Sequence, residues 1–394
     1  MLFSPRRARR HEDKKIMDKK DLNVKRVLVT GSDGFIGKNL IEGLQRKEDV
    51  EIKAFDIEDD IDRLTAHLKE ADIVFHLAGV NRPERTVEFE TGNTGLTRTI
   101  VDILKRLKRN ISIVFSSSIQ VTLDNPYGIS KRKAEDILIE YSQKSNAKVY
   151  IYRFPNVFGK WCRPNYNSVV ATFCHNISHG LGISISDVNK EIELVYIDDV
   201  VGEFLNILSQ EGGDRNKYHY KINRTFRITL GELAERTYQL RDIRKTLVVP
   251  DLSDDLMKYL HATYLSYLDK DDFSCKLDIK TDQRGSLGEL IKSDHFGQIF
   301  VSTTHKGVIR GNHYHNTKVE KFCVLKGEAV IKFRHILEDE VLSYHVSGDE
   351  IEIVDIPPGY THSIENLGND EMIVLFWANQ IFDPCNPDTY YCEV

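Results

Sequence analysis

Paired cysteines, long apolar runs and an excess of positive charge are all missing from this sequence of 394 residues. The six cysteines form no C-x-x-C pair, so we expect reduced thiols and a cytoplasmic location, not a disulfide framework. No apolar run is long enough to cross a bilayer, which excludes a membrane-spanning enzyme. The net charge of −6 argues against a nucleic-acid-binding surface.

What is present is the composition of an ordinary globular protein. Hydrophobic residues make up 41% and charged residues 29%, and the length suggests two or three domains with ample core. Residues 1–24 stand apart because arginines and lysines recur there, including the adjacent Arg6 and Arg7. No apolar segment follows them, as an export signal would require. We predict a disordered basic tail or a stretch upstream of the natural start.

Apolar strands and helical patterns alternate in the first part of the chain. Short segments such as Val27–Thr30 and Glu51–Phe55 are almost wholly apolar, and helical periodicity follows in stretches such as Thr94–Lys108. Strands of this kind are buried on both faces. The pattern predicts an α/β domain over 25–270 with a Rossmann-type, doubly wound parallel sheet.

The pattern changes near residue 270. Beyond it, glycines separate short strands such as Glu328–Arg334 and Met372–Trp377, and long helical periodicity disappears. This is typical of an antiparallel barrel or sandwich. The polar stretch Leu268–Asp272 marks the predicted boundary, so we expect an all-β domain over 271–394.

Three glycines mark a dinucleotide-binding turn. Gly31, Gly34 and Gly37 directly follow a strand and open a helix, and Phe35 and Ile36 lie between them. Such a turn brings backbone and a helix N-terminus close to a pyrophosphate. The sequence therefore predicts that the first domain binds a nicotinamide dinucleotide.

Asp56 ends the second strand of that domain. A carboxylate at this place bonds both ribose hydroxyls of NAD and repels the extra phosphate of NADP. Taken alone, Asp56 therefore favours NADH. The alternative is that Asp56 is an ordinary acidic loop residue exposed to solvent.

A second group of residues suits proton transfer. Tyr127 and Lys131 are four residues apart, so on a helix they share a face. A lysine cation near a phenol lowers its pKa and makes it a usable proton donor or acceptor. The serines Ser116 to Ser118 end the preceding strand, where a hydroxyl can hold a carbonyl oxygen.

Together these residues resemble the extended short-chain dehydrogenase/reductase family. The resemblance covers roughly residues 25–268 and is carried by Thr30–Gly37, His76–Gly79, Ser116–Ser118, Tyr127–Lys131, Arg153–Gly159 and Val195–Val200. It implies that Ser118, Tyr127 and Lys131 are catalytic, that Ala78 and Gly79 contact the cofactor, and that Asn156 faces a sugar nucleotide. One departure is the short gap between Ser118 and Tyr127, which predicts a more open substrate pocket.

The second domain carries a set of residues with the spacing of metal ligands. His313 and His315 are two apart, so on a strand they point to the same side, and Glu320 can return on the next strand. His362 follows later, after Pro357-x-Gly359. Three imidazoles and one carboxylate suit Zn²⁺, Fe²⁺, Ni²⁺ or Mn²⁺ with one position open. The string resembles the cupin signature, although the glycine before its second half is set further back than usual.

The order of the two domains resembles a family of bifunctional capsular-polysaccharide enzymes over nearly the whole of residues 25–394, and so do the segments Gly79–Glu84, Gly159–Cys162 and Asn165–Ser168. The resemblance implies a zinc-containing homodimer with a UDP-sugar substrate and NADPH. Asp56 argues for NADH instead, so we expect either NADPH or NADH as the cofactor. Its cupin domain would epimerise carbon 3 of a UDP-4-keto-6-deoxy-N-acetylhexosamine. Its reductase domain would reduce the carbon-4 ketone to UDP-2-acetamido-2,6-dideoxy-L-talose, on the way to UDP-N-acetyl-L-fucosamine.

Two rival hypotheses remain open from the sequence. In the first, the cupin domain is only a structural or dimerisation module and the chain is a simple nucleotide-sugar reductase. In the second, the whole chain is a dinucleotide-sensing scaffold without turnover, against which the complete set of Ser118, Tyr127 and Lys131 argues.

Overall fold

The computed structural model describes residues 24–209, 214, 216–276, 279–282, 285–288, 291, 297–380, 383 and 385–394. The predicted basic tail at 1–24 lies outside the described residues, apart from Val24. None of the helices in the described part of the chain is both long and apolar enough to span a bilayer.

A six-stranded parallel sheet forms the centre of the first domain, in the order β2-β1-β3-β4-β5-β8. Its strands are β1 (Lys25–Thr30), β2 (Val50–Phe55), β3 (Ile73–His76), β4 (Ser112–Ser118), β5 (Val149–Phe154) and β8 (His219–Tyr220). The strand order reverses direction between β1 and β3. In open sheets of this kind, ligands bind in the crevice at such a reversal. The predicted Rossmann-type sheet is confirmed.

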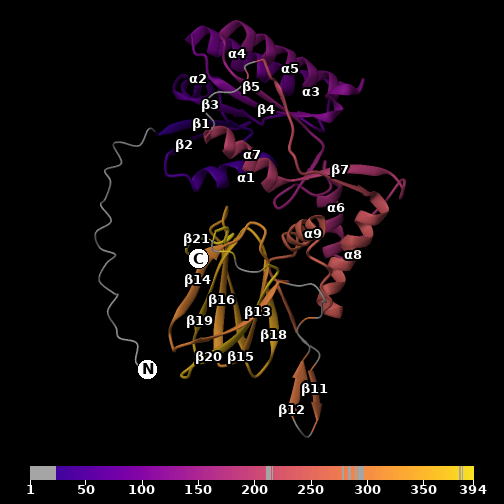
Figure 1. Ribbon diagram of the computed structural model, residues 1–394, viewed down its shortest axis with the longest axis vertical. Coiled ribbons are helices and arrows are strands. Elements are labelled where there is room, and N and C mark those ends of the chain that lie inside the picture. Colours follow the sequence, from indigo (N-terminus) through magenta and orange to yellow (C-terminus); the bar gives the residue numbers. More distant parts are fainter. Residues whose placement is uncertain are drawn as a thin grey trace, which may run out of the picture.

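Helices cover both faces of this sheet (Figure 1). On one face lie α2 (Ile61–Glu70), α4 (Leu96–Leu107) and α5 (Pro126–Ser145), and on the other lie α1 (Phe35–Gln45) and α7 (Ile197–Ser209). Because side chains alternate along a strand, Leu28 packs into the core of the first face, whereas Val27 and Val29 pack into that of the second. Short helical segments connect the layers: α3 (Val87–Phe89), the π-helix η1 (Glu90–Gly95) and the 3-10 helix η2 (Ile119–Thr122).

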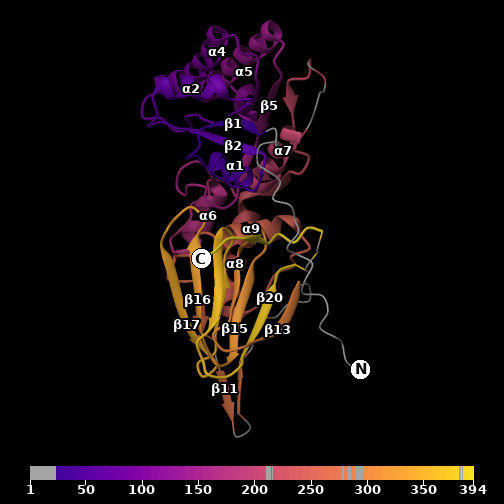
Figure 2. The ribbon, with the colours of Figure 1, turned by 90° about the vertical axis from the view of Figure 1, so that its left-hand side faces the viewer.

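A smaller layer lies between this sheet and the rest of the chain. It holds the three-stranded sheet β6-β7-β9 and three helices. These elements are β6 (Asn156–Phe158), β7 (Glu191–Tyr196), β9 (Phe226–Thr229), α6 (Val169–Ser178), α8 (Leu230–Thr246) and α9 (Asp255–Leu265). Their apolar side chains share one continuous core with the last part of the chain, since Leu260 of α9 belongs to the same cluster as Val354 and Trp377. Figure 2 shows α6, α8 and α9 against that last part.

The last part of the chain, here called the β domain, starts at β10 and is built from two five-stranded antiparallel sheets. Their orders are β10-β18-β15-β20-β13 and β17-β16-β19-β14-β21, and the β11–β12 hairpin projects away from both (Figure 1). The strands are β10 (Ser274–Lys276), β11 (Ile279–Asp282), β12 (Gly285–Gly288), β13 (Gln298–Thr304), β14 (Ile309–Tyr314), β15 (Glu320–Lys326), β16 (Glu328–His335), β17 (Val341–Ser347), β18 (Glu352–Ile356), β19 (Tyr360–Asn366), β20 (Met372–Ala378) and β21 (Tyr390–Tyr391). The predicted antiparallel β fold is confirmed.

Candidate functional site

The glycine turn after β1 is shaped by close backbone contacts. Gly31 has φ of +71°, and a Cβ there would lie 2.6 Å from the nitrogen of Ala78. A Cβ on Gly37 would lie 2.1 Å from the carbonyl oxygen of Gly31. Both positions therefore need glycine, and Gly34 is the N-cap of α1. The turn leaves a shallow backbone cradle in front of the helix N-terminus, which is the geometry that holds a pyrophosphate.

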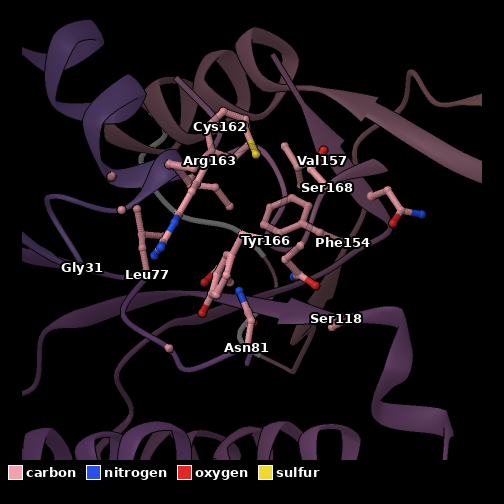
Figure 3. Close-up of a pocket in the computed structure, with 18 of the residues that line it drawn as sticks. Gly31, Leu77, Asn81, Ser118, Phe154, Val157, Cys162, Arg163, Tyr166 and Ser168 are labelled. Atoms are coloured by element: carbon pink, nitrogen blue, oxygen red, sulfur yellow. The ribbon is translucent and has the colours of Figure 1, made fainter. Parts of the chain in front are cut away.

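A cavity of about 650 Å³ lies at the point where the strand order reverses (Figure 3). Most of the predicted first-domain site residues line it: Gly31, Gly34, Phe35, Ile36, Gly37, Gly79, Ser118, Tyr127, Lys131 and Asn156. Ala78 and Asp56 are not among its lining residues. Ala78 instead lies behind the turn, where its backbone abuts Gly31. The structure thus brings together residues that are far apart in the sequence.

The three serines at the end of β4 have three different partners. Ser116 accepts a hydrogen bond at its carbonyl oxygen from the Nζ of Lys131, at 2.9 Å. The buried Ser117 hydroxyl donates to Glu135 at 2.5 Å. The side chain of Ser118 accepts from the backbone nitrogen of Gln120 at 3.2 Å and also acts on the pKa of the Tyr127 phenol. Of the three serines, Ser118 is therefore the one whose hydroxyl stands beside the tyrosine in the cavity.

The ionisation of Tyr127 differs from the expectation. Burial raises the pKa of Tyr127 to about 12, although the hydrogen bond from Ser118 opposes this rise. We expected Lys131 to lower the pKa of Tyr127, and this expectation is wrong. The ammonium of Lys131 is directed to the carbonyl of Ser116 and the ring of Phe115 instead. Burial lowers the pKa of Lys131 to about 8, with Glu135 opposing the shift. Tyr127 is thus a neutral phenol that holds a proton at neutral pH.

The carboxylate of Asp56 is held by the glycine turn. One oxygen accepts from the backbone nitrogen of Asp33 at 2.7 Å, and the other accepts from that of Ile57 at 2.8 Å. The residue therefore ties the end of β2 to the turn after β1. This fixes a negative charge beside the predicted ribose position.

Two residues of this region were not predicted from the sequence. Asn93, buried in the π-helix, bonds both the nitrogen and the oxygen of Val80 and the hydroxyl of Ser130, so it fixes the loop after β3 against α5. Arg163 lines the cavity, and its guanidinium lies 4.9 Å from the ring of Tyr166. In Figure 3 it extends toward Leu77 and the glycine turn. A buried asparagine and a loop arginine carry no periodic signal, so neither stood out in the sequence.

The four predicted metal ligands come together in the β domain. Their ligand atoms, from His313, His315, Glu320 and His362, all lie within 4.8 Å of one another. The histidines come from β14, the residue just after it and β19 of one sheet, and the carboxylate comes from the start of β15 in the other. The cluster therefore bridges the two sheets near the end that faces the first domain.

Local backbone geometry aims these side chains. The pairing of β14 with β19 shifts register between Gly311 and His313, at an intervening Asn312 with φ of +56°. Such a bulge re-aims the following side chains. The Nδ1 of His315 lies 2.6 Å from the carbonyl oxygen of Asp388, which leaves its Nε2 toward the cluster. Ligand histidines are commonly oriented in this way.

The cluster has the donor set and the unsatisfied atoms that fit a divalent cation. The Nε2 atoms of His315 and His362 are buried without a hydrogen-bond partner in the described structure. Burial and the neighbouring histidines lower the pKa of His313 to about 4. Burial alone would raise the pKa of Glu320, but the imidazoles of His315 and His362, whose Nε2 atoms lie 3.4 and 3.6 Å from its carboxylate, hold this pKa well below its usual range. Neutral imidazoles and an ionised carboxylate are the forms that bind a metal.

Comparison with known proteins matches both parts of the chain. Residues 27–222 match the NAD dependent epimerase/dehydratase family, and residues 280–390 match the polysaccharide biosynthesis C-terminal domain. The chain is 44% identical over 369 residues to UDP-2-acetamido-2,6-beta-L-arabino-hexul-4-ose reductase of Pseudomonas aeruginosa, covering 94% of this chain and 99% of that protein. It is 45% identical to the crystal structure of the capsular polysaccharide assembling protein CapF from Staphylococcus aureus, with a TM-score of 0.64 and coverage of 93% and 100%.

The chain belongs to the CapF family. A further CapF structure, with the inhibitor 3-isopropenyl-tropolone, is 40% identical with a TM-score of 0.60 and covers 94% of this chain and 100% of that one. In this chain, the epimerase/dehydratase match is followed by the polysaccharide biosynthesis C-terminal match. The expected resemblance to bifunctional capsular-polysaccharide enzymes is confirmed.

Proposed function

We propose that this protein performs two linked reactions on one nucleotide sugar. The β domain, placed at 271–394, epimerises carbon 3 of a UDP-4-keto-6-deoxy-N-acetylhexosamine, and residues 25–270 reduce the carbon-4 ketone. The product is UDP-2-acetamido-2,6-dideoxy-L-talose, a precursor of UDP-N-acetyl-L-fucosamine for capsule or O-antigen. One observation carries the proposal: the Ser118–Tyr127–Lys131 cavity and the four-ligand cluster lie on one chain that aligns over nearly its whole length with a hexul-4-ose reductase.

The glycine turn and its neighbours fit the dinucleotide. Backbone groups of Gly34 to Gly37 and the N-terminus of α1 suit the pyrophosphate, and the Arg163 guanidinium adds a positive charge on the opposite wall. The fit rests on the tight turn that Gly31 and Gly37 permit, since a Cβ at either position would collide with backbone atoms of the protein. Bound NADPH or NADH supplies the hydride for carbon 4.

The side chains of the cavity handle the proton and the orientation of the ketone. Ser118 donates a hydrogen bond that fixes the carbon-4 oxygen beside Tyr127. Tyr127, whose pKa lies at about 12, keeps its proton until the oxygen gains negative charge and then donates it. Lys131 supplies a buried positive charge beneath the site, and Asn156 lies where it can bond the sugar nucleotide.

The four-ligand cluster fits the first reaction. A Zn²⁺ ion held by the three histidines and Glu320 would polarise a keto oxygen as a Lewis acid. Other divalent ions suit the same donors. A ketone makes the proton on the neighbouring carbon acidic, so removal of the carbon-3 proton and its return to the other face inverts that centre. Reduction of the ketone then removes this acidity and fixes the configuration.

The core shared between the β domain and α9 favours a second role for the β domain. In this alternative, the β domain only supports the reductase fold. The two proposals differ in one outcome, because a purely supporting β domain gives no exchange at carbon 3.

We also propose a cytoplasmic homodimer. Its support is the edge strand β13, where the exposed Ile299 and Phe300 offer an apolar surface to a second copy. Sedimentation at several concentrations tests the dimer, and a monomer at all of them would contradict it.

Oxidation of NADPH and NADH in the presence of the UDP-4-keto-6-deoxy sugar tests the reductase directly. The wild type should consume reduced nicotinamide only when the keto sugar is present. Tyr127→Phe, which removes the proton and little else, should lower the rate about 10²- to 10⁴-fold. Its folding and dinucleotide affinity should match the wild type. Equal rates for the two proteins would contradict the proposed role of Tyr127.

A further inference from the structure

Trp161 sits on a strained turn between the two domains. It follows β6 and has φ of +69°, a conformation that a bulky L-residue rarely adopts. Strain of this kind persists only where the surroundings enforce it, commonly at functional sites. The contacts of the ring show which surroundings do so here.

The β domain provides the surface on which the Trp161 ring rests. A Cβ on Gly359 would lie 2.9 Å from the ring, so the absence of a side chain there admits the indole. The ring of His335 packs edge-on against it, with centroids 5.5 Å apart. Gly359 in turn donates its backbone N–H to the carbonyl oxygen of the metal-cluster residue His315, at 3.0 Å. The indole therefore lies on the turn next to the metal cluster.

Neighbouring residues hold the same segment from the reductase side. The Nζ of Lys160 lies 5.1 Å from the indole centroid and 3.0 Å from a carboxylate oxygen of Asp198. The hydroxyl of Tyr267, on the segment that leads to the β domain, donates to the carbonyl oxygen of Cys162 at 2.5 Å. The turn is therefore held by the β domain, by the Lys160–Asp198 pair and by Tyr267.

Trp161 also lines the reductase cavity, together with Asn156 and Tyr166. Figure 3 shows the next two residues, Cys162 and Arg163, at the wall of the same cavity. One side chain is therefore shared between the wall of the reductase cavity and the surface of the β domain.

We propose that Trp161 is a positioning residue through which the β domain shapes the nucleotide-sugar side of the reductase cavity. This rests on the proposed function, because it assumes that a UDP-sugar occupies that side. Loss of support for the indole then weakens binding of the nucleotide sugar without changing the proton donor. The reductase needs its partner domain in place to bind substrate well.

The chain offers a direct probe, since it has two tryptophans, Trp161 and Trp377. In a Trp377→Phe background, emission reports Trp161 alone, and titration with UDP should change that emission in a saturable way. His335→Ala, which removes the edge-on support, should raise the Kd for UDP and the KM for the keto sugar about fivefold or more. The kcat, the affinity for the dinucleotide and the metal content should stay unchanged. For Trp161→Phe, the Kd for UDP and the KM for the keto sugar should lie between those of the wild type and those of His335→Ala.

Tyr344→Phe is the control, because it removes the hydrogen bonds of a hydroxyl near the domain boundary, to the carbonyl of Lys270 and from the backbone nitrogen of Phe273, without touching the indole. It should leave both Kd and KM unchanged. UDP binding without any change in Trp161 emission would overturn the inference, as would equal effects of His335→Ala and Tyr344→Phe. A wild type that binds UDP with the expected emission change but reduces no keto sugar would instead overturn the proposed function. Failure of UDP to bind the wild type would overturn both.

Discussion

Tyr314 donates a hydrogen bond through its hydroxyl to the carboxylate of Glu42, across the boundary between the two domains. Tyr314 lies between two of the metal-cluster histidines on β14, and Glu42 lies on α1, the helix that begins at the glycine turn. Both residues are buried, and Arg46 pairs with Glu42 while its guanidinium lies 4.0 Å from the ring of Tyr390. The metal strand and the cofactor helix are therefore in direct contact.

This contact should contribute measurably to stability. Tyr314→Phe deletes the donor and leaves a buried carboxylate with one partner fewer, which should cost about 1–3 kcal/mol in the free energy of unfolding. Urea unfolding followed by circular dichroism measures it. Tyr391→Phe makes the same change at a 75% exposed tyrosine and should fall within about 0.5 kcal/mol of the wild type. Equal stabilities of the two variants would show that the contact contributes nothing.

Asp56 should decide the preference between the two nicotinamide cofactors. Its carboxylate places a negative charge at the end of β2, where it favours a ribose hydroxyl over a 2′-phosphate. Asp56→Ala should therefore shift the ratio of kcat/KM for NADPH to that for NADH toward NADPH. Steady-state kinetics with each cofactor measures this ratio. A ratio that does not move would rule out any contact between this residue and the adenosine ribose.

The reductase should lose efficiency at alkaline pH through Lys131. Burial lowers the pKa of Lys131 to about 8, so the free enzyme loses this positive charge as the pH rises through 8. The pKa of Tyr127 lies at about 12, so the phenol keeps its proton throughout this range. The pH profile of kcat/KM, which reports the free enzyme, should fall above an apparent pKa near 8. A flat profile up to pH 10 would contradict this assignment.

The lowered pKa of Lys131 also makes the stability of the fold depend on pH. Between pH 8 and 10.5 the unfolded chain holds a proton on Lys131 that the folded chain has released. This residue therefore destabilises the fold at neutral pH, and its penalty disappears as the pH rises through that window.

The sequence was most informative where the pattern was periodic. The apolar strands of the parallel sheet and the spacing of Tyr127 and Lys131 predicted the first domain and its cavity. The helix α5 begins at Pro126, is capped by Asn125, and includes both Tyr127 and Lys131, as their spacing of four residues indicated. The polar cap and the proline mark this start more clearly than hydrophobic periodicity does.

The sequence was least informative where function interrupts the pattern. Hydrophobic periodicity did not mark β14 and β19, because Gly311, Asn312 and the histidines break the alternation of apolar and polar residues. Only the spacing of the histidines placed His313 and His315 on a strand. Spacing still predicted their histidines as ligands. The role of Trp161 could not be predicted, since it depends on contacts with Gly359 and His335, which are remote in the sequence.

Hydrogen exchange at carbon 3 of the UDP-4-keto-6-deoxy sugar tests the central claim most directly. The sugar is incubated in deuterated water with metal-loaded wild-type protein and no nicotinamide, and deuterium is located by NMR. The account predicts deuterium at carbon 3, and its loss in His313→Ala together with the bound metal, while that variant still reduces a sugar already in the epimerised configuration. No deuterium at carbon 3 with the metal-loaded wild type would contradict the account and leave a reductase with a supporting β domain.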